Sequence, residues 1–372
     1  MFGPRQSGKT TLAKSVFPQK PYISLEDPDS RLEAIEDPRK FLGRFPDGAI
    51  IDEAQKAPEI FSYIQTLVDE IKRPGFFVLT GSQNFLLSER ISQSLAGRAA
   101  INHLLPLSFE EVKSASLLPP SPEDLLFKGG FPALYDHNIG PLDFFPSYIQ
   151  TYIERDVRLI KNISDLSLFQ KFLLLCSGRI GQIVNLSSLA NDCGISHNTA
   201  KSWLSILEAS YIIFLLQPFH KNFNKRLIKS PKLYFYDTGL ACHLLGIENV
   251  RQLPSHFALG GIFESWVVSE IFKYRANLGL RPNCFFWRDK SGNEVDAVVA
   301  KADRLSAVEI KAAKTVNPDF FKGLRCWQEL AKNEKSTGHL IYAGESSYQR
   351  AQENVFGWRD LDRALAQIYK QP

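Results

Sequence analysis

The chain has 372 residues, of which 44% are hydrophobic and 23% are charged, and its formal net charge is +4. This composition is ordinary for a globular protein and excludes a disordered or collagen-like chain, and the length allows two or three domains. So small a net charge does not by itself indicate an acidic partner, so any argument for nucleic-acid binding has to come from local patches.

The cysteines and the apolar runs indicate the compartment. The five cysteines are scattered and form no C-x-x-C pair, which argues against a zinc site or a disulfide framework and favours a reducing compartment. No charged segment followed by an apolar run opens the chain, and the most apolar stretch, residues 211–216, is too short to span a bilayer. We therefore expect a cytoplasmic protein with no membrane partner.

The N-terminal stretch fits the phosphate-binding pattern G-x-x-x-x-G-K-[ST] at every fixed position. Its glycines allow several backbone N–H groups to converge on a phosphate, its lysine adds a cation, and the hydroxyl of Thr10 is a ligand for Mg²⁺. Residues 10–17 are predicted to form a helix whose N-terminus faces the phosphates, which favours an ATP site over an ordinary Gly/Ser turn. The predicted ATP-binding residues here are Gly3, Pro4, Arg5, Gln6, Ser7, Gly8, Lys9, Thr10 and Thr11.

A phosphate-binding loop of this kind follows a buried strand, but only Met1 and Phe2 precede Gly3. We therefore expect the strand before the loop to be missing and the numbering to begin inside the domain. Without that strand the loop has a free end, and its phosphate affinity should suffer.

Residues 48–55 predict an apolar strand that ends in two acids. Asp52 would hold Mg²⁺ through water, and Glu53 would orient and polarise the attacking water. An acidic turn after a strand is weak evidence alone, but it is good evidence some distance after a complete phosphate-binding loop.

The remaining elements to residue 115 alternate between strands and helices, which predicts a parallel sheet with its ligands at the strand C-termini. Ser82 or Gln83, at the end of one strand, is placed to sense the γ-phosphate or the water. The expected strands are residues 21–27, 76–83 and 100–107, and the expected helical stretches are residues 28–45 and 57–72 and a segment that ends at residues 96–98.

Several motifs together resemble the prokaryotic predicted ATPases of the AAA+ superfamily that carry a C-terminal region of unknown function. The resemblance covers nearly the whole chain. It implies that Arg98 is a candidate finger to a neighbouring subunit's γ-phosphate in a homo-oligomer; pairing with a surface acid is the equal alternative. The motifs lie at residues 3–11, 51–55, 79–82, 95–98, 128–132, 152–157, 234–240 and 309–311.

Residues 116–180 follow a Pro-rich boundary and predict helices near residues 123–128, 141–160 and 165–178, which could form a lid on the nucleotide domain. Arg155 and Arg158 either contact nucleotide or another domain or, as the pattern favours, form ion pairs within a helix.

Residues 186–209 have helix-turn-helix spacing, with Ser187 or Ser188 capping the first helix, Gly194 in the turn and Ser196 capping the second helix. Strands at residues 211–216 and 232–236 would complete a winged helix over residues 181–250. A DNA-binding role and a packing or dimerisation role both remain open. The candidate DNA contacts are Asn198 and Lys201 on the second helix and Lys221, Lys225, Arg226 and Lys229 in the basic connection between the strands.

Residues 255–345 predict a helix and then strands near residues 284–288, 294–299 and 305–310. Asp296 lies in one strand and Glu309 and Lys311 share a face of the next, because side chains alternate along a strand. With Glu264 from the helix, this order resembles the D…E-x-K constellation of restriction-endonuclease-like folds, which binds Mg²⁺. The alternatives are a domain that binds nucleic acid without cutting it and an edge strand with alternating surface charge.

The fold class expected is therefore α/β: an AAA+-type parallel sheet over residues 1–115, a helical lid over 116–180, a winged helix, a restriction-endonuclease-like domain, and a C-terminal helix over 346–372. The leading hypothesis is an ATPase that uses Mg²⁺ and acts on DNA or on a protein partner. A metal-dependent nuclease regulated by ATP and a non-hydrolysing DNA-binding switch are the alternatives.

Overall fold

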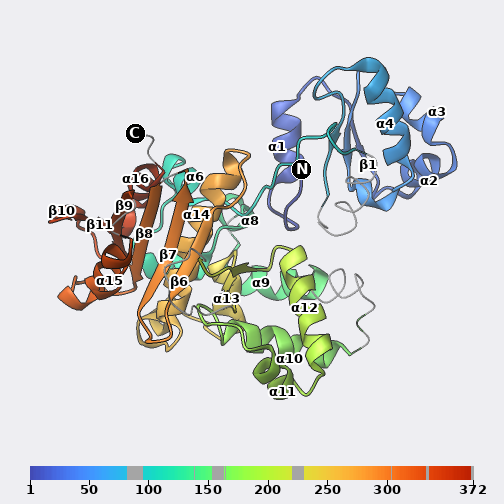
Figure 1. Ribbon diagram of the computed structural model, residues 1–372. Helices are drawn as coiled ribbons and strands as arrows, with labels where there is room; N and C mark the ends of the chain where they lie inside the picture. Colours follow the sequence, from blue (N-terminus) through green and yellow to red (C-terminus); the bar gives the residue numbers. More distant parts are fainter. Residues whose placement is uncertain are drawn as a thin grey trace. The chain divides into compact units, whose positions relative to one another are not determined.

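The computed structural model describes residues 1–81, 95–137, 139–152, 163, 165–219, 230–302, 304–331 and 335–369. The chain divides into two compact units, described separately here. The first comprises Met1–Pro106 with Ala209–Tyr211, and the second comprises Leu107–Glu208 with Ile212–Pro372. Figure 1 shows the first unit in blue.

The first unit is built on a parallel sheet of three strands in the order β1-β2-β3. These strands are β1 (Tyr22–Ser24), β2 (Ile50–Asp52) and β3 (Val78–Leu79). Ile50 and Ile51 of the central strand are fully buried, as an apolar run in a parallel sheet requires. The strands are shorter than predicted, but the parallel sheet itself is confirmed, and Asp52 ends its central strand.

Four α-helices and a 3₁₀ turn accompany this sheet in the described residues. Helix α1 forms Lys9–Val16, α4 forms Ile60–Ile71, and the turn η1 forms Ala54–Lys56. The single helix expected over residues 28–45 is instead two, α2 (Pro28–Glu36) and α3 (Pro38–Gly43). Asp37 ends the first helix and caps the second, because Pro38 cannot continue a helix but begins one readily.

The first two residues take the place where a strand is expected before the loop. Phe2 pairs with Gly81 on one side and with His103 on the other, and its N–H donates to Asn102 O at 2.8 Å. Phe2 is buried, and the N–H of Leu104 donates to Phe2 O at 2.7 Å. Of the strand predicted over residues 100–107, the structure has a single bridge at His103.

Gly3 follows at a point where the backbone of another segment approaches closely. A Cβ atom at this position would lie 1.9 Å from Leu104 O, which is far inside any contact distance. Only glycine fits here, and the start of the loop is fixed against residues 102–104.

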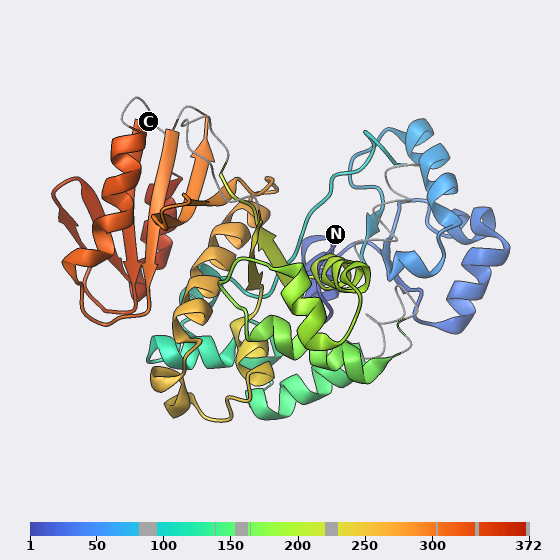
Figure 2. The ribbon, with the colours of Figure 1, turned by 60° about the horizontal axis from the view of Figure 1, so that its bottom comes forward.

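The second unit begins with short helices that share one apolar core with later elements. The long helix α14 (Leu259–Asn277) lies between these helices and a large sheet (Figures 1 and 2). The predicted boundaries at residues 115/116 and 180/181 stay predictions. The other helical elements here are α6 (Phe109–Ser114), α7 (Pro122–Lys128), α8 (Ala133–Asp136), α9 (Pro141–Tyr148), α10 (Leu166–Ser177), α13 (Thr238–Leu244) and η3 (Val250–Ser255).

The helix-turn-helix segment has the predicted elements. Helices α11 (Leu186–Cys193) and α12 (His197–Ala209) are joined through Gly194, which adopts a left-handed conformation. The first cap differs from the prediction, because Asn185 rather than a serine accepts the N–H of Ser188. Strands β4 (Ile213–Leu216) and β5 (Lys232–Phe235) follow as an antiparallel pair.

A six-stranded sheet completes this unit, in the order β10-β11-β9-β8-β7-β6. Helix α14 and helix α16 (Leu361–Ile368) share a core with one face of it, and helix α15 (Lys322–Leu330) shares a core with the other. The strands and turns are β6 (Cys284–Arg288), β7 (Glu294–Lys301), β8 (Arg304–Lys311), β9 (Lys335–Tyr342), β10 (Tyr348–Arg350), β11 (Glu353–Gly357), η4 (Pro318–Phe321) and η5 (Trp358–Asp360).

Residues 346–372, which were expected to form a C-terminal helix, also contribute β10 and β11 to this sheet. Among the described residues, no helix is both long enough and apolar enough to cross a membrane.

The Gly3 contact leads to a first prediction. Gly3→Ala should destabilise the first unit by about 2 kcal/mol or more, because the added carbon overlaps backbone that cannot move aside cheaply. Hydrogen exchange of peptides from β2 would measure this. Gly43→Ala is the matched control, since a Cβ there meets no atom within 4 Å. All five tryptophans lie beyond residue 200, so tryptophan fluorescence should report unchanged unfolding of the second unit. Equal exchange in both variants would contradict the prediction.

A second prediction concerns His339 in β9. Its ring is buried, and burial lowers its pKa to about 4. The histidine in the unfolded chain binds a proton near pH 6.5, whereas the folded one binds it only near pH 4. Protonation therefore favours the unfolded state, and the free energy of unfolding falls as the pH drops from 6.5 toward 4.

Urea unfolding of the second unit, followed by tryptophan fluorescence, should therefore show a loss of about 2–3 kcal/mol between pH 7 and pH 4 that His339→Gln lacks. Parallel pH profiles for the two proteins would show that His339 is not responsible.

Candidate functional site

The phosphate-binding loop leads directly into α1. Gly8, the residue before the helix, has φ 88°, and Gln6 also has a positive φ of 61°. Ser7 Oγ donates to Pro4 O at 2.9 Å, which closes the turn from inside. These conformations give the loop the tight path that the glycine positions predict.

Lys9 is buried within this loop. Its ammonium group donates to Gly3 O at 3.1 Å and to Pro4 O at 2.6 Å. Burial lowers the pKa of Lys9 to about 8, while Glu53 and Asp52 oppose the shift. An anionic phosphate beside the lysine would favour its charged form further, so this residue suits the role predicted for it.

Asp52 joins the loop to the strand that carries the acids. Thr10 Oγ1 donates to Asp52 Oδ2 at 2.8 Å, although the two residues are far apart in the sequence. Tyr22 OH donates to the same oxygen at 2.9 Å, and Thr80 Oγ1 donates to Oδ1. Burial is the largest effect on the pKa of Asp52 and raises it, but the hydroxyl donors together lower this pKa below its ordinary value. Asp52 is therefore held as a carboxylate.

This arrangement fits Mg²⁺. The hydroxyl of Thr10 gives its proton to Asp52, so its oxygen lone pairs remain available to a cation. A hydroxyl and a carboxylate are ligand types that Mg²⁺ prefers. Thr10 and Asp52 would hold the ion, directly or through water, next to the bound phosphates.

Glu53 follows Asp52 in an unusual backbone conformation, with φ 54° and ψ 42°. A left-handed glutamate costs free energy, and such strain is concentrated at functional sites. Its side chain accepts a hydrogen bond from Gln55.

Arg98 forms an ion pair with Asp69 of α4. Its Nε and Nη2 atoms lie 2.5 and 2.9 Å from the two carboxylate oxygens. This is the surface-acid contact that was the alternative to a finger, and the finger role stays a prediction. Ser82, Gln83, Arg155 and Arg158 lie outside the described residues.

A cavity of about 500 Å³ in the first unit does not mark the nucleotide site. It is lined by apolar residues such as Phe2, Ile64 and Phe77, and by none of the residues Gly3 to Thr11. The candidate site is therefore defined by the loop and by its contacts with Asp52.

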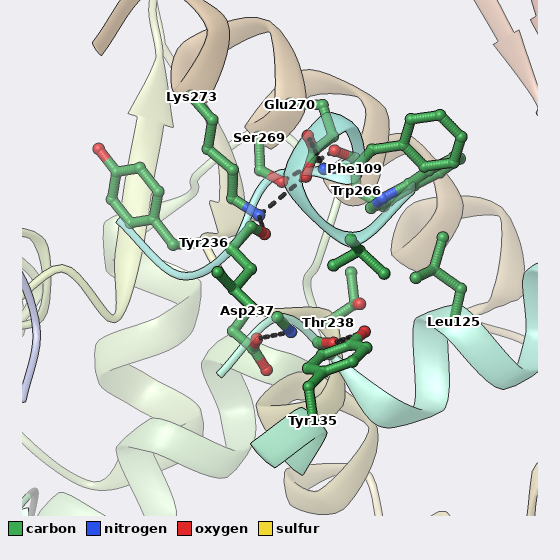
Figure 3. Close-up of a pocket in the computed structure, with 14 residues that line it drawn as sticks. Phe109, Leu125, Tyr135, Tyr236, Asp237, Thr238, Trp266, Ser269, Glu270 and Lys273 are labelled. Carbon is green, nitrogen blue, oxygen red and sulfur yellow. Dashed lines mark hydrogen bonds and ion pairs between the residues drawn. The ribbon is translucent and has the colours of Figure 1, made fainter. Parts of the chain in front are cut away.

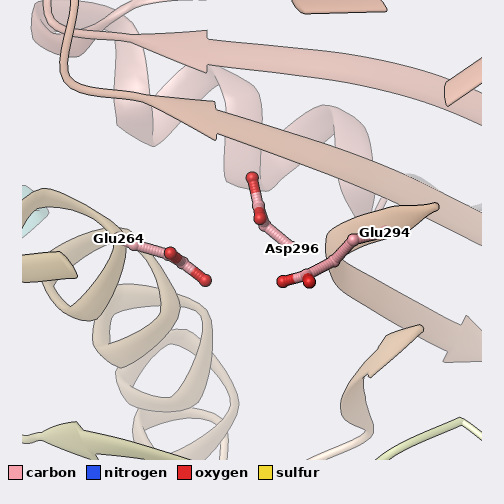
Figure 4. Close-up of side chains that lie close together, drawn as sticks. All are labelled: Glu264, Glu294 and Asp296. Carbon is pink, nitrogen blue, oxygen red and sulfur yellow. The ribbon is translucent and has the colours of Figure 1, made fainter. Parts of the chain in front are cut away.

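The second unit brings Glu264 and Asp296, two acids predicted for a nuclease site, together with Glu294, which was not predicted. The carboxylate oxygens of Glu264, Glu294 and Asp296 lie within 4.8 Å of one another, and Figure 4 shows these side chains converging from α14 and β7. On the neighbouring strand, Lys311 Nζ lies 2.6 Å from Glu309 Oε1 and 3.3 Å from Asp296 Oδ2. The period of two along β8 thus predicted correctly that Glu309 and Lys311 meet.

Lys232 of β5 also enters this cluster. Its ammonium lies 2.8 Å from Glu264 Oε1 and 3.8 Å from Asp296 Oδ1, and it forms an ion pair with Glu294. Lys232 is only 3% exposed. Its charge is therefore directed to these acids and not to solvent.

The electrostatics of the cluster favour a charged Lys232. Burial is the largest effect on its pKa and lowers it, but Glu264, Asp296 and Glu294 together raise the pKa well above its ordinary value. Burial also raises the pKa of Glu264 to about 7 and that of Glu309 to about 8. The point where three carboxylates meet is thus filled by an ammonium group, and these residues as arranged do not fit a resident Mg²⁺ ion.

The candidate DNA-binding helix exposes the face that was predicted. Asn198 and Lys201 are exposed, whereas Ala200, Trp203, Leu204 and Leu207 are buried. Ser196 Oγ accepts the N–H of Thr199 at 3.0 Å, as expected for the cap. Lys221, Lys225, Arg226 and Lys229 lie outside the described residues, so the basic connection stays a prediction.

A buried polar network lies farther along α14 (Figure 3). Lys273 Nζ contacts Glu270 Oε1 at 2.8 Å and donates to Leu107 O at 3.0 Å, and Glu270 Oε2 accepts the N–H of Phe109 at 2.7 Å. The cavity beside these residues measures about 20 Å³, room for about one water molecule. The network is therefore a structural fastening and not a ligand site.

The sequence interpretation missed four residues that contact the two candidate sites. Tyr22 of β1 and Thr80, the residue after β3, bond to Asp52 from either side of β2, and only the sheet order places them there. Glu294 precedes Asp296 by two positions, a spacing that could have indicated a shared face. Lys232 carried no local signal, because its partners come from α14 and β7.

Comparison with known proteins divides the chain into three matched regions. Residues 1–113 match the model of an AAA domain. Residues 120–251 and 259–361 match two domains of unknown function, DUF8612 and DUF4143. These matches support an AAA-type, ATPase-like protein with a C-terminal region of unknown function, as the resemblance predicted.

Similar full-length chains are uncharacterized proteins of bacteria and archaea. The chain is 29% identical to one from Mycobacterium tuberculosis, over 93% of this chain and 76% of the relative. It is 26% identical to one from Methanocaldococcus jannaschii, over 64% and 60% of the two chains. A protein of Haemophilus influenzae is 23% identical, over 69% of this chain and 68% of the relative. The AAA domain match is thus what indicates nucleotide binding.

Proposed function

We propose that this protein binds ATP with Mg²⁺ and hydrolyses it at the loop Gly3–Thr11, with Asp52 and Glu53 as the acids. The observation that carries the proposal is the 2.8 Å hydrogen bond between Thr10 and Asp52, which joins the two motifs at one point. The match of residues 1–113 to an AAA domain supports the same activity.

Each residue has a distinct role in this proposal. Lys9 exchanges its contacts with Gly3 O and Pro4 O for phosphate oxygens, and Thr10 and Asp52 hold the metal ion. Glu53 orients the attacking water, which a carboxylate at the end of a strand is suited to do. When bound, Mg²⁺ would neutralise charge on the phosphates.

The proposal is tested by ATP binding and turnover in wild type, Lys9→Ala and Glu53→Gln. Lys9→Ala should lose binding, because the cation for the phosphates is gone. Glu53→Gln should bind ATP and lose most of its turnover, by about 100-fold or more, because the group that polarises water is neutral.

Lys40→Ala, which removes an exposed lysine of α3, is the control and should behave as wild type. Equal activity in all four proteins would refute the proposal. Tight ATP binding without hydrolysis in wild type would favour the non-hydrolysing switch.

DNA is the second candidate partner, and the exposed face of α12 favours it. Asn198 and Lys201 stand on the helix that a helix-turn-helix unit places against DNA. Since this face carries a single lysine, phosphate contact is better supported than readout of a base sequence. A partner protein and a second copy of the chain are the other candidate partners for this face.

Lys201→Glu should therefore weaken binding of a labelled duplex in fluorescence anisotropy by about tenfold and reduce the salt dependence of binding by about one phosphate contact. Lys40→Glu carries the same charge change on α3, outside the proposed face. An equal loss in both variants would indicate non-specific attraction, and no loss in Lys201→Glu would remove α12 from the interface.

The nuclease alternative has less support. Asp296, Glu309 and Lys311 do meet, but Lys232 occupies the point where Glu264, Glu294 and Asp296 converge. No cleavage step is therefore assigned to this cluster.

A further inference from the structure

The carboxylates of Glu264, Glu294 and Asp296 converge on one point. Two of these acids, Glu264 and Asp296, belong to the set that the resemblance to restriction-endonuclease-like folds assigns to a metal ion. Three mutually repelling acids at this separation need a cation between them. In this chain one is built in, because Lys232 Nζ contacts an oxygen of each of the three.

We infer that the Lys232 ammonium is the resident cation of this cluster, and that it excludes a divalent ion from the point where Glu264, Glu294 and Asp296 converge. The cluster then serves as a clamp that fastens β5 to α14 and β7, and it is not a metal centre.

The surroundings of Lys232 are those of a permanent contact. Tyr234, two residues later on β5, donates to the same Glu264 oxygen through its hydroxyl group. Ser265 Oγ exchanges hydrogen bonds with both the N–H and the C=O of Phe235, at 3.0 and 2.9 Å. The strand is thus fixed to α14 at Lys232, Tyr234 and Phe235, which holds Lys232 in register with the acids.

The remaining charges of the cluster have cations of their own. Lys311 contacts Glu309 and Asp296, and Arg288 Nη1 lies 3.2 Å from Glu294 Oε2. A divalent ion would therefore have to displace a buried ammonium from its carboxylates. Leaving one partner of a buried ion pair unpaired is strongly unfavourable, so the exchange is opposed.

The test compares wild type with Lys232→Met, both carrying Asp52→Asn and both free of nucleotide, so that the predicted ATP–metal site does not contribute. Binding of Mn²⁺ is measured by electron paramagnetic resonance, and thermal unfolding is measured with and without about 1 mM Mn²⁺. Wild type should show no ion bound at the cluster and an unchanged Tm.

Lys232→Met should have a lowered Tm, because three acids are left without their cation. It should bind one Mn²⁺ at least about tenfold more tightly than wild type, and the ion should restore part of the lost Tm, since a ligand that binds only the folded state stabilises it. Adding Glu264→Gln to this variant should remove the restoration.

Lys273→Met is the matched control. Lys273 is also a buried lysine in contact with α14 acids, but its ion pair is with Glu270 alone. Its loss should lower the Tm without restoration by Mn²⁺, because a single carboxylate does not make a site for the ion.

Two outcomes would overturn the inference. The first is stoichiometric Mn²⁺ binding by wild type that is lost in Glu264→Gln, a result that stands even if Lys232→Met does not fold. The second is a folded Lys232→Met that neither binds the ion nor gains stability from it, which would mean that the lysine does not hold the place of a metal.

Discussion

A helix that is buried along most of its length has to neutralise every charge it carries, and α14 is such a helix. Burying a charge without a partner costs several kcal/mol, so each ionised side chain on α14 determines what packs beside it. Glu264 requires Lys232 and Tyr234 from β5, and Glu270 with Lys273 requires the backbone at Leu107 and Phe109. These requirements bring segments far apart in the sequence to one helix.

The first unit depends on a comparable centre of smaller size. The Asp52 carboxylate is bonded by hydroxyl groups from the loop helix, from β1 and from the residue after β3. Since these donors hold Asp52 ionised and in place, the geometry for a metal ion and a phosphate is prepared by the fold itself. A nucleotide would exchange contacts here with little rearrangement of the backbone.

The sequence predicted elements well where local periodicity decides and poorly where distant partners decide. The order of α14, β6, β7 and β8, the two helices around Gly194 and the meeting of Glu309 with Lys311 all follow from spacing alone. The strand predicted over residues 100–107 is a single bridge between His103 and Phe2, and such a pairing across the chain cannot be read from local periodicity. The role of Lys232 was likewise not predicted, because the acids that surround this lysine lie on other elements.

The fastening at Leu107 has a mechanical consequence. The N–H of Leu107 is bonded to Gly130 O, its C=O accepts from Lys273, and the N–H of Phe109 is held by Glu270. The chain therefore enters the second unit at residues whose backbone groups are fixed by hydrogen bonds. A force along the backbone at this point would act directly on α14 through Lys273 and Glu270. The same helix carries Glu264, which pairs with Lys232.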